Sequence, residues 1–103
     1  LINNMAFNAQ NISNSTATKI DEANTSTVEG IRVSNTKSSG AVVIDLYIQN
    51  IDDDTIYYIL NSVSIPNGTT LSLGQLDIAY DNVNYDLYIL SDSSGGDLSI
   101  ITN

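Results

Sequence analysis

The chain has 103 residues, of which 42% are hydrophobic, and this is enough for one small domain with its own core. Twelve acidic residues against three basic ones give a net charge of −9, which argues against direct binding of nucleic acid because Lys and Arg make most phosphate contacts. The chain has no Cys and no His, so disulfides, Cys or His metal ligands and histidine-based catalysis are excluded, and we expect no cofactor.

Membrane contact is not expected either. No run approaches the roughly 18 apolar residues that a membrane-spanning helix needs. The first residues lack the basic start and apolar core of a signal peptide. We therefore expect a protein that is made in the cytoplasm and is soluble there.

Residues 1–26 are predicted to form an N-terminal arm that precedes a β-sandwich domain over residues 27–103. Residues 8–26 are mostly Asn, Ser, Thr and Ala, and such a segment buries too little apolar area to offset its ordering entropy. It is either a flexible arm or a strand that orders against a neighbour. The preceding "LINNMAF" is rich in apolar side chains that are unfavourable in water. We predict that the arm contacts a partner protein through Leu1, Ile2, Met5, Phe7 and Ile12.

From residue 28 onward, apolar residues recur with a period of two, which indicates half-buried strands. Seven short strands are predicted, within residues 28–35, 41–49, 55–65, 69–73, 76–80, 84–90 and 97–102. No stretch has helical periodicity. The predicted core-facing residues are Ile31, Val33, Val42, Ile44, Leu46, Ile48, Tyr57, Ile59, Val63, Ile65, Leu71, Leu73, Leu76, Ile78, Tyr80, Tyr85, Leu87, Ile89, Leu98 and Ile100, with Tyr58 and Leu60 on the opposite face of their strand.

Turn signals separate these strands. "Pro66-Asn67-Gly68" has Pro where φ must be near −65° and Gly where φ must be positive, and it is predicted to close a hairpin. Residues 37–40, 52–54 and 93–96 are the other predicted loops. Short alternating strands joined by such turns favour an all-β fold, an antiparallel β-sandwich of the jelly-roll or immunoglobulin-like kind with an extended N-terminal arm.

Carboxylates offer the only candidates for metal binding or catalysis. Asp52, Asp53 and Asp54 are adjacent, but a calcium loop spaces its acidic ligands and includes a sharp Gly turn, so a solvated hairpin loop is the favoured interpretation. Asp45 and Asp86 lie on predicted strands and form a possible glycosidase pair, although nothing marks either as buried. No Ser or Thr has an evident base to activate it. We predict that the protein is not an enzyme and holds no metal.

Three tyrosines are the candidate surface residues of the predicted sandwich. Tyr47, Tyr58 and Tyr88 fall on the less apolar faces of their strands. Outward tyrosines are enriched at protein interfaces, and ordinary cross-strand pairing on a solvated sheet explains them equally well.

The order of these segments resembles small virion structural proteins of tailed bacteriophages. The resemblance runs from "MAFNAQNIS" through "EGIRVSNTKSSGAVVIDLYIQ", "VSIPNGTTLSL" and "LDIAYDNVNYDLYIL" to "GDLSIIT". The third of these pieces, with an apolar strand, a Pro-Asn-Gly-Thr corner and a leucine strand, carries most of it. The resemblance implies a non-enzymatic β-sandwich protein that attaches to the virion in many copies.

Three functions stay open at this point. The resemblance leads us to expect a capsid decoration or cement protein, homo-oligomeric and bound to the major capsid protein or other virion proteins through its arm and outer sheet. A neck or tail accessory protein is the nearest alternative. A carbohydrate-binding module is the alternative from another class, and it would require a linear row of aromatic side chains on one face.

Overall fold

The computed structural model describes residues 8–12, 15–21, 23, 28–92 and 98–102, and these contain strands and no helix. In chain order the strands are β1 (Asn8–Ile12), β2 (Thr18–Asp21), β3 (Ile31–Asn35), β4 (Val42–Asn50), β5 (Ile56–Ile65), β6 (Thr70–Leu73), β7 (Tyr85–Ser91) and β8 (Leu98–Thr102).

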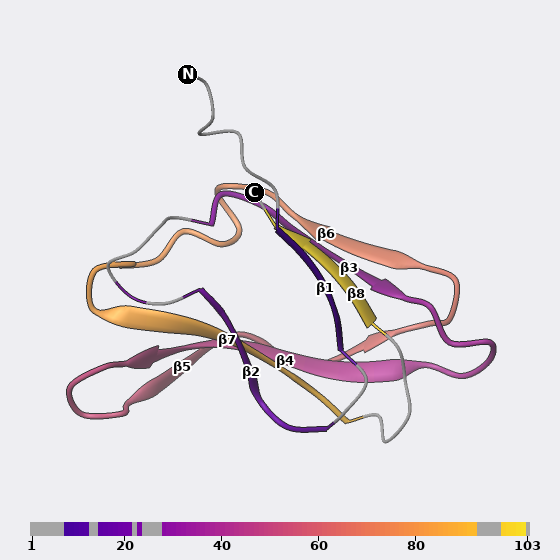
Figure 1. Ribbon diagram of the computed structural model, residues 1–103, viewed down its shortest axis with the longest axis horizontal. Coiled ribbons are helices and arrows are strands. Elements are labelled where there is room, and N and C mark those ends of the chain that lie inside the picture. Colours follow the sequence, from indigo (N-terminus) through magenta and orange to yellow (C-terminus); the bar gives the residue numbers. More distant parts are fainter. Residues whose placement is uncertain (1–7, 13–14, 22, 24–27, 93–97, 103) are drawn as a thin grey trace.

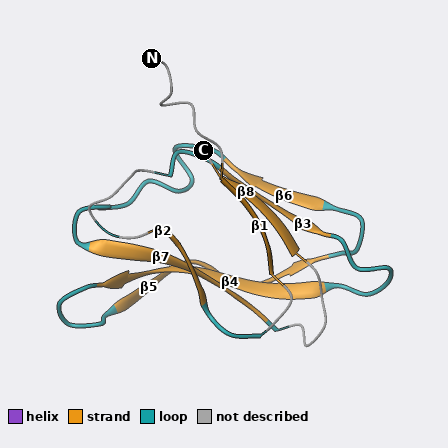
Figure 2. Ribbon diagram, in the orientation of Figure 1, coloured by secondary structure: helices purple, strands orange, loops and turns teal. Residues whose placement is uncertain are grey.

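These strands form two four-stranded antiparallel sheets that pack face to face (Figures 1 and 2). The first sheet has the order β1-β8-β3-β6 and the second has the order β2-β7-β4-β5. Of the consecutive strands, only β4 and β5 are hydrogen-bonded neighbours, and most connections cross from one sheet to the other. This order is that of an eight-stranded jelly roll. The prediction of an all-β antiparallel sandwich is confirmed.

The core lies between the sheets and follows the predicted alternation on most strands. Val42, Ile44 and Leu46 of β4 are fully buried, as are Leu87 and Ile89 of β7. Their neighbours in sequence face outward because successive side chains of a strand alternate between its two faces. The inner face of the first sheet contributes Ile12, Ile31, Val33, Leu98 and Ile100.

Two segments of the predicted N-terminal arm, residues 8–12 and 18–21, take part in the sandwich. β1 pairs with β8 at one edge of the first sheet, and β2 pairs with β7 at one edge of the second. Ile12 is part of the core cluster. Polar residues are compatible with these strands because an edge strand gains its hydrogen bonds from the main chain, while its outward side chains stay in water. Residues 8–12 and 18–21 therefore belong to the same fold as residues 28–92 and 98–102.

The prediction of a strand within residues 76–80 is wrong. This segment belongs to the connection that leads from β6 in the first sheet to β7 in the second. A turn opens it, in which the Asp77 amide donates to the Gly74 carbonyl and the Gly74 amide donates to the Asp77 carboxylate, both at 3.0 Å. Ile78 is completely buried, whereas Leu76 is 95% exposed, so alternation here places one side chain in the core without any sheet pairing.

The turn predicted at residues 66–68 is confirmed, but it does not close a hairpin. Gly68 has a φ of 76°, and the Thr69 amide donates to the Pro66 carbonyl at 3.2 Å. The two strands that it joins, β5 and β6, lie in different sheets. The turn therefore carries the chain across the end of the sandwich.

β5 also departs from simple alternation. Its pairing with β4 shifts register twice, so that Leu46 lies opposite Leu60 and Tyr47 opposite Tyr58. Ser62 lies at the register shift between Leu60 and Val63. It has a φ of 57°, and its amide donates to the Asp45 carboxylate at 2.7 Å. Because each extra residue resets the alternation, Leu60 packs against the core instead of facing outward as predicted.

Candidate functional site

The three outward tyrosines form one row across the outer face of the second sheet. Tyr47 of β4 lies opposite Tyr58 of β5 on one side and opposite Tyr88 of β7 on the other. The Tyr47 and Tyr58 ring centroids are 5.6 Å apart and tilted by 60°. The Tyr47 and Tyr88 centroids are 5.4 Å apart with nearly parallel rings. We call Tyr58, Tyr47 and Tyr88 the tyrosine row.

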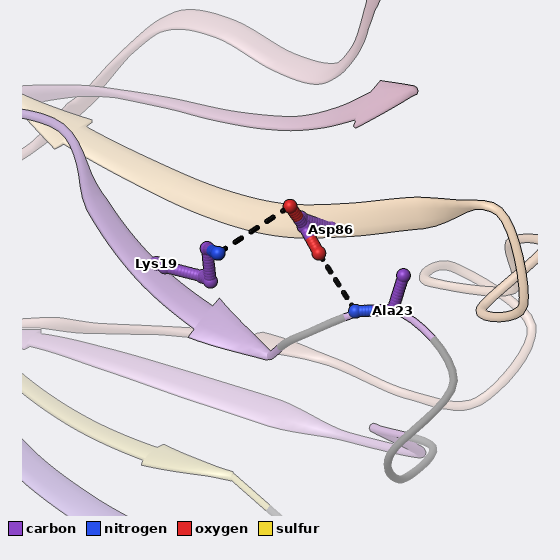
Figure 3. A network of polar contacts seen from close by, with 3 residues as sticks. All are labelled: Lys19, Ala23 and Asp86. Carbon is purple, nitrogen blue, oxygen red and sulfur yellow. Dashed lines mark hydrogen bonds and ion pairs between the residues drawn. The ribbon is translucent and has the colours of Figure 1, made fainter. Parts of the chain in front are cut away.

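Lys19 of β2 extends the tyrosine row to the other edge of the sheet. Its Nζ lies 5.9 Å from the centroid of the Tyr88 ring, within the range of a cation–π contact. The same Nζ lies 3.5 Å from Oδ2 of Asp86, whose Oδ1 accepts a 2.7 Å hydrogen bond from the Ala23 amide (Figure 3). The row therefore ends at the Lys19 ammonium, and the Asp86 carboxylate that pairs with it also binds the main chain just after β2.

The rings of the row are not equally accessible. Tyr47 is 8% exposed because both of its neighbours stack against it, whereas Tyr58 is 53% exposed. Burial, followed by the neighbouring Tyr88, Tyr58 and Asp45, raises the pKa of the Tyr47 hydroxyl. Ring contacts on both sides leave little free ring face on Tyr47, so Tyr58 is the member best placed to contact another molecule.

A hollow of about 260 Å³ lies on the same face. Its lining includes Val43, Asp45 and Leu90, which are close to the tyrosine row along β4 and β7. One carboxylate oxygen of Asp45 accepts from Ser62, and one of Asp92, another lining residue, accepts from the Val43 amide. The hollow therefore presents carboxylates that are held in place by backbone donors.

Exposed apolar side chains collect where β4 turns into β5. Ile51, Ile56, Tyr57 and Tyr58 are the exposed large hydrophobic residues of this hairpin. Tyr57 meets Tyr85 of β7 edge-to-face with ring centroids 6.1 Å apart. Both faces of the sheet are thus aromatic at the beginning of β5. Tyr58 lies on the outer face with the tyrosine row, and Tyr57 lies on the opposite face. Apolar exposure concentrated in this way is typical of an interaction surface.

The acidic loop between these strands has a structural role. The side-chain oxygen of Asn50 accepts from the amides of Asp52 and Asp53, and the Asp53 carboxylate accepts from the Thr55 amide. Hydrogen bonding from Thr55 lowers the pKa of the Asp53 carboxyl. Asp54 has a φ of 63°, as a tight hairpin requires. Within the described residues, no group of three His, Cys, Asp or Glu is arranged to hold a metal ion.

The candidate glycosidase pair is too far apart for that chemistry. Asp86 lies opposite Gln49 on β4, four residues from Asp45 on the same strand. Four residues span about 13 Å of strand, and paired catalytic carboxylates are separated by at most roughly 9.5 Å. Each carboxylate also accepts a backbone hydrogen bond.

The predicted interface residues fall into three groups. Leu1, Ile2, Met5 and Phe7 lie outside the described residues. Ile12 is 3% exposed and packs in the core of its own chain, and its use in a partner contact stays a prediction. Tyr47, Tyr58 and Tyr88 come together in the tyrosine row. The use of Tyr47, Tyr58 and Tyr88 in a protein interface stays a prediction.

The sequence pattern did not identify Lys19 and Ile56 as residues of this surface. Lys19 sits in a segment without apolar alternation, and only the pairing of β2 with β7 brings it opposite Tyr88. Ile56 is the first residue of β5, and the alternation of that strand marked only later residues as core-facing. Strand order decides both positions, and alternation does not reveal strand order.

The fold and this surface define a jelly-roll sandwich with an aromatic row on one outer face. No protein-family model matches the chain, and no curated protein matches it either. No helix that could cross a membrane occurs in the described part of the chain.

Proposed function

We propose that this protein is a non-enzymatic structural protein of a tailed bacteriophage virion, attached to the head as a capsid decoration or cement protein. A neck or tail accessory role is the nearest variant of the proposal. The location rests on the sequence resemblance. The role in assembly rests on one structural observation, the exposed apolar end of the second sheet around Ile56, Tyr57 and Tyr58, which can contact virion proteins or further copies of the chain.

This observation favours a role in assembly because of its contrast with the rest of the chain. The protein carries a net charge of −9, yet β5 contains no charged residue. A protein with this charge distribution stays soluble because its copies repel each other, and it associates through the region that lacks charge. Repeated copies on a lattice convert modest single contacts into durable attachment.

The jelly-roll topology is compatible with the proposal. Jelly rolls occur in viral capsid proteins and also in lectin domains, so the fold alone does not choose between assembly and sugar binding. A choice has to come from the surface, and Tyr47 offers little ring face for stacking on a sugar.

The location is tested on purified particles. Phage would be induced from the strain whose genome carries the gene, banded on a density gradient and probed by gold-labelled antibody against the purified protein. Label over the head supports decoration, and label confined to the neck or tail supports the accessory variant. Absence of the protein from every particle fraction would overturn the virion proposal.

The contribution of the N-terminus needs a short truncation. Removal of residues 1–26 would delete β1 and β2 and expose the core around Ile12, so loss of attachment in that variant would report unfolding. Removal of residues 1–7 leaves both strands intact. The proposal predicts that purified heads lacking the protein bind the full chain more tightly than the chain without residues 1–7.

Carbohydrate binding is the second candidate, and the tyrosine row with its neighbouring hollow is the observation that favours it. A sugar ring would stack on Tyr58 while its hydroxyls donate to Asp45 and Asp92. Pull-down on insoluble cellulose, chitin and bacterial peptidoglycan tests this directly. Retention that is lost in Tyr58→Ala and kept in Leu76→Ala would establish the binding module, whereas no retention on any of these polymers would count against it.

A further inference from the structure

The two sheets leave four edge strands, and they are not protected equally. β1, β6 and β2 are five, four and four residues long, whereas β5 has ten residues. β2 carries the charged residues Lys19 and Asp21, and charges on an edge strand prevent edge-to-edge pairing. β5 pairs with β4 on one side, and no strand of the described residues covers its other side. Among the described residues the main-chain groups along that side pair with no other strand, so they can accept one.

The first half of β5 also has the composition of a pairing edge. Residues 56–60, "IYYIL", contain no charge, Pro or Gly, and their first three side chains are exposed. The pairing of β5 with β4 shifts register twice, once between Tyr58 and Leu60 and again near Ser62. An uncharged stretch, residues 56–60, therefore lies between the acidic loop and Ser62, and residues 56–58 of it precede the first register shift.

We propose that this stretch pairs with the same stretch of a second copy, antiparallel, with Tyr58 of each copy next to a two-fold axis. In this register Ile56 and Tyr57 lie beside Leu60 and Ile59 of the other copy, where the shift between Tyr58 and Leu60 displaces the side chains from regular alternation. An isologous contact of this kind closes on itself, so the product is a dimer and not a fibre. The second sheets of the two copies become one continuous sheet of eight strands.

Charge selects this antiparallel arrangement. Asp52, Asp53 and Asp54 immediately precede β5. Antiparallel pairing about Tyr58 places the two acidic loops at opposite ends of the contact, with Asp54 opposite the uncharged Ser62 of the other copy. Parallel pairing would bring the six carboxylates together and is disfavoured by their repulsion.

The tyrosine row gives the second copy its specificity. Within one chain the row runs across the sheet from Tyr88 through Tyr47 to Tyr58 at the open edge. With Tyr58 beside the two-fold axis, the next ring outward is Tyr58 of the other copy, and the row continues without a break to its Tyr88. The 53% exposed ring of Tyr58 is thereby covered on its free side.

The dimer is tested on the purified full chain and does not depend on the virion proposal. Sedimentation velocity over a concentration series is expected to show a mass of about twice 11.1 kDa that dissociates on dilution. Ile56→Lys places a charge on the open edge and is expected to give only monomer. Ile101→Lys is the matched control, because Ile101 is 37% exposed against 39% for Ile56 but lies on β8, an interior strand. A wild-type monomer at all concentrations, or a dimer that survives Ile56→Lys, would overturn the proposal.

A cross-link tests the register independently of any destabilised variant. The chain has no Cys, so Tyr58→Cys introduces a single thiol. Residues directly opposite on antiparallel strands have Cβ atoms about 4.5–5.5 Å apart, close enough for a disulfide after modest adjustment. Mild oxidation is expected to produce a covalent dimer of Tyr58→Cys rapidly at low protein concentration. Leu76→Cys, which is more exposed, serves as the collision control, and equal rates for the two variants would rule out this register.

Discussion

The side-chain amide of Asn35 donates a 2.8 Å hydrogen bond to the main-chain carbonyl of Ile65, and this bond ties the end of β3 in the first sheet to the end of β5 in the second. The same amide group donates to the Gly40 carbonyl at 3.0 Å, and its oxygen accepts from the Lys37 amide at 2.9 Å. The main chain of Asn35 also bonds to Gly68 and Thr69. One buried residue thus joins both connections at this end of the sandwich.

Asn35→Ala is expected to lower the free energy of unfolding by about 2–4 kcal/mol, because it leaves buried main-chain groups without partners. Urea denaturation followed by circular dichroism measures the change. Asn67→Ala, at an exposed position in the adjacent turn, should change stability by less than about 0.5 kcal/mol. Similar losses in both variants would contradict the role given to Asn35.

Gly68→Ala is expected to cost about 1–2 kcal/mol through main-chain conformation alone. Its φ of 76° disfavours a Cβ, although nothing lies within 4 Å of the place where that atom would be. Gly74→Ala is the control, since its Cβ would make only an ordinary contact with the Asp77 carboxylate. Gly68→Asn should recover part of the loss, because Asn tolerates positive φ. Equal melting temperatures for Gly68→Ala and Gly74→Ala would refute this account.

Tyr80 is expected to make the protein sensitive to alkali. Burial, then its 2.9 Å hydrogen bond to Asp21 and the nearby carboxylates of Asp21 and Asp86, raises the pKa of the Tyr80 hydroxyl well above the ordinary value of 10. Below pH 10 both folded and unfolded chains keep this proton. Above pH 10 the unfolded chain releases it first, so the free energy of unfolding falls as pH rises.

Urea denaturation between pH 8 and 11.5 measures this slope. Tyr80→Phe should be less stable than the wild type at pH 8, because it loses the bond to Asp21, and should show a shallower decline above pH 10. A Tyr80→Phe profile parallel to that of the wild type would show that other groups cause the alkaline loss.

Asp86→Ala is expected to destabilise the fold more than Lys19→Ala does. Asp86 is largely buried and supports both the Lys19 ammonium and the Ala23 amide, so its removal should cost about 1–3 kcal/mol. The Lys19 side chain is 40% exposed, and its ion pair contributes less than about 1 kcal/mol. Thermal melts of the two variants at low and high salt provide the comparison. A larger effect of Lys19→Ala would mean that the ion pair, and not the bond to Ala23, dominates.

Within the tyrosine row, Tyr47→Ala and Tyr58→Ala should separate stability from surface function. Tyr47 stacks on two rings and is nearly covered, so its truncation is expected to cost about 2–4 kcal/mol. Tyr58 has one of these ring contacts and is half exposed, so its loss should cost less than about 1.5 kcal/mol. Denaturation at protein concentrations below dimer formation gives the comparison. The reverse order would contradict the stacking described for the row.

Alternation in the sequence predicted several strands closely. Val42, Ile44 and Leu46 of β4 are buried as expected, and the same holds for Leu87, Ile89, Leu98 and Ile100. The turn at Pro66-Asn67-Gly68 was also predicted from its residues. In each case the cause is local. Strand pleating fixes which side chains share a face, the ring of Pro66 fixes its φ, and the missing Cβ of Gly68 permits a positive φ.

Sequence by itself therefore determined that this is a small, acidic all-β protein and where most of its strands and one of its sharp turns lie. Only the tertiary structure decided that polar residues 8–12 and 18–21 are edge strands, that residues 76–80 cross between sheets, and that Tyr58, Tyr47 and Tyr88 form one row. The physical reason is that a strand's pattern records which face is buried but not which strand lies beside it. Pairing is made by main-chain groups that every residue carries, so neighbours are chosen by the packing of the whole sandwich.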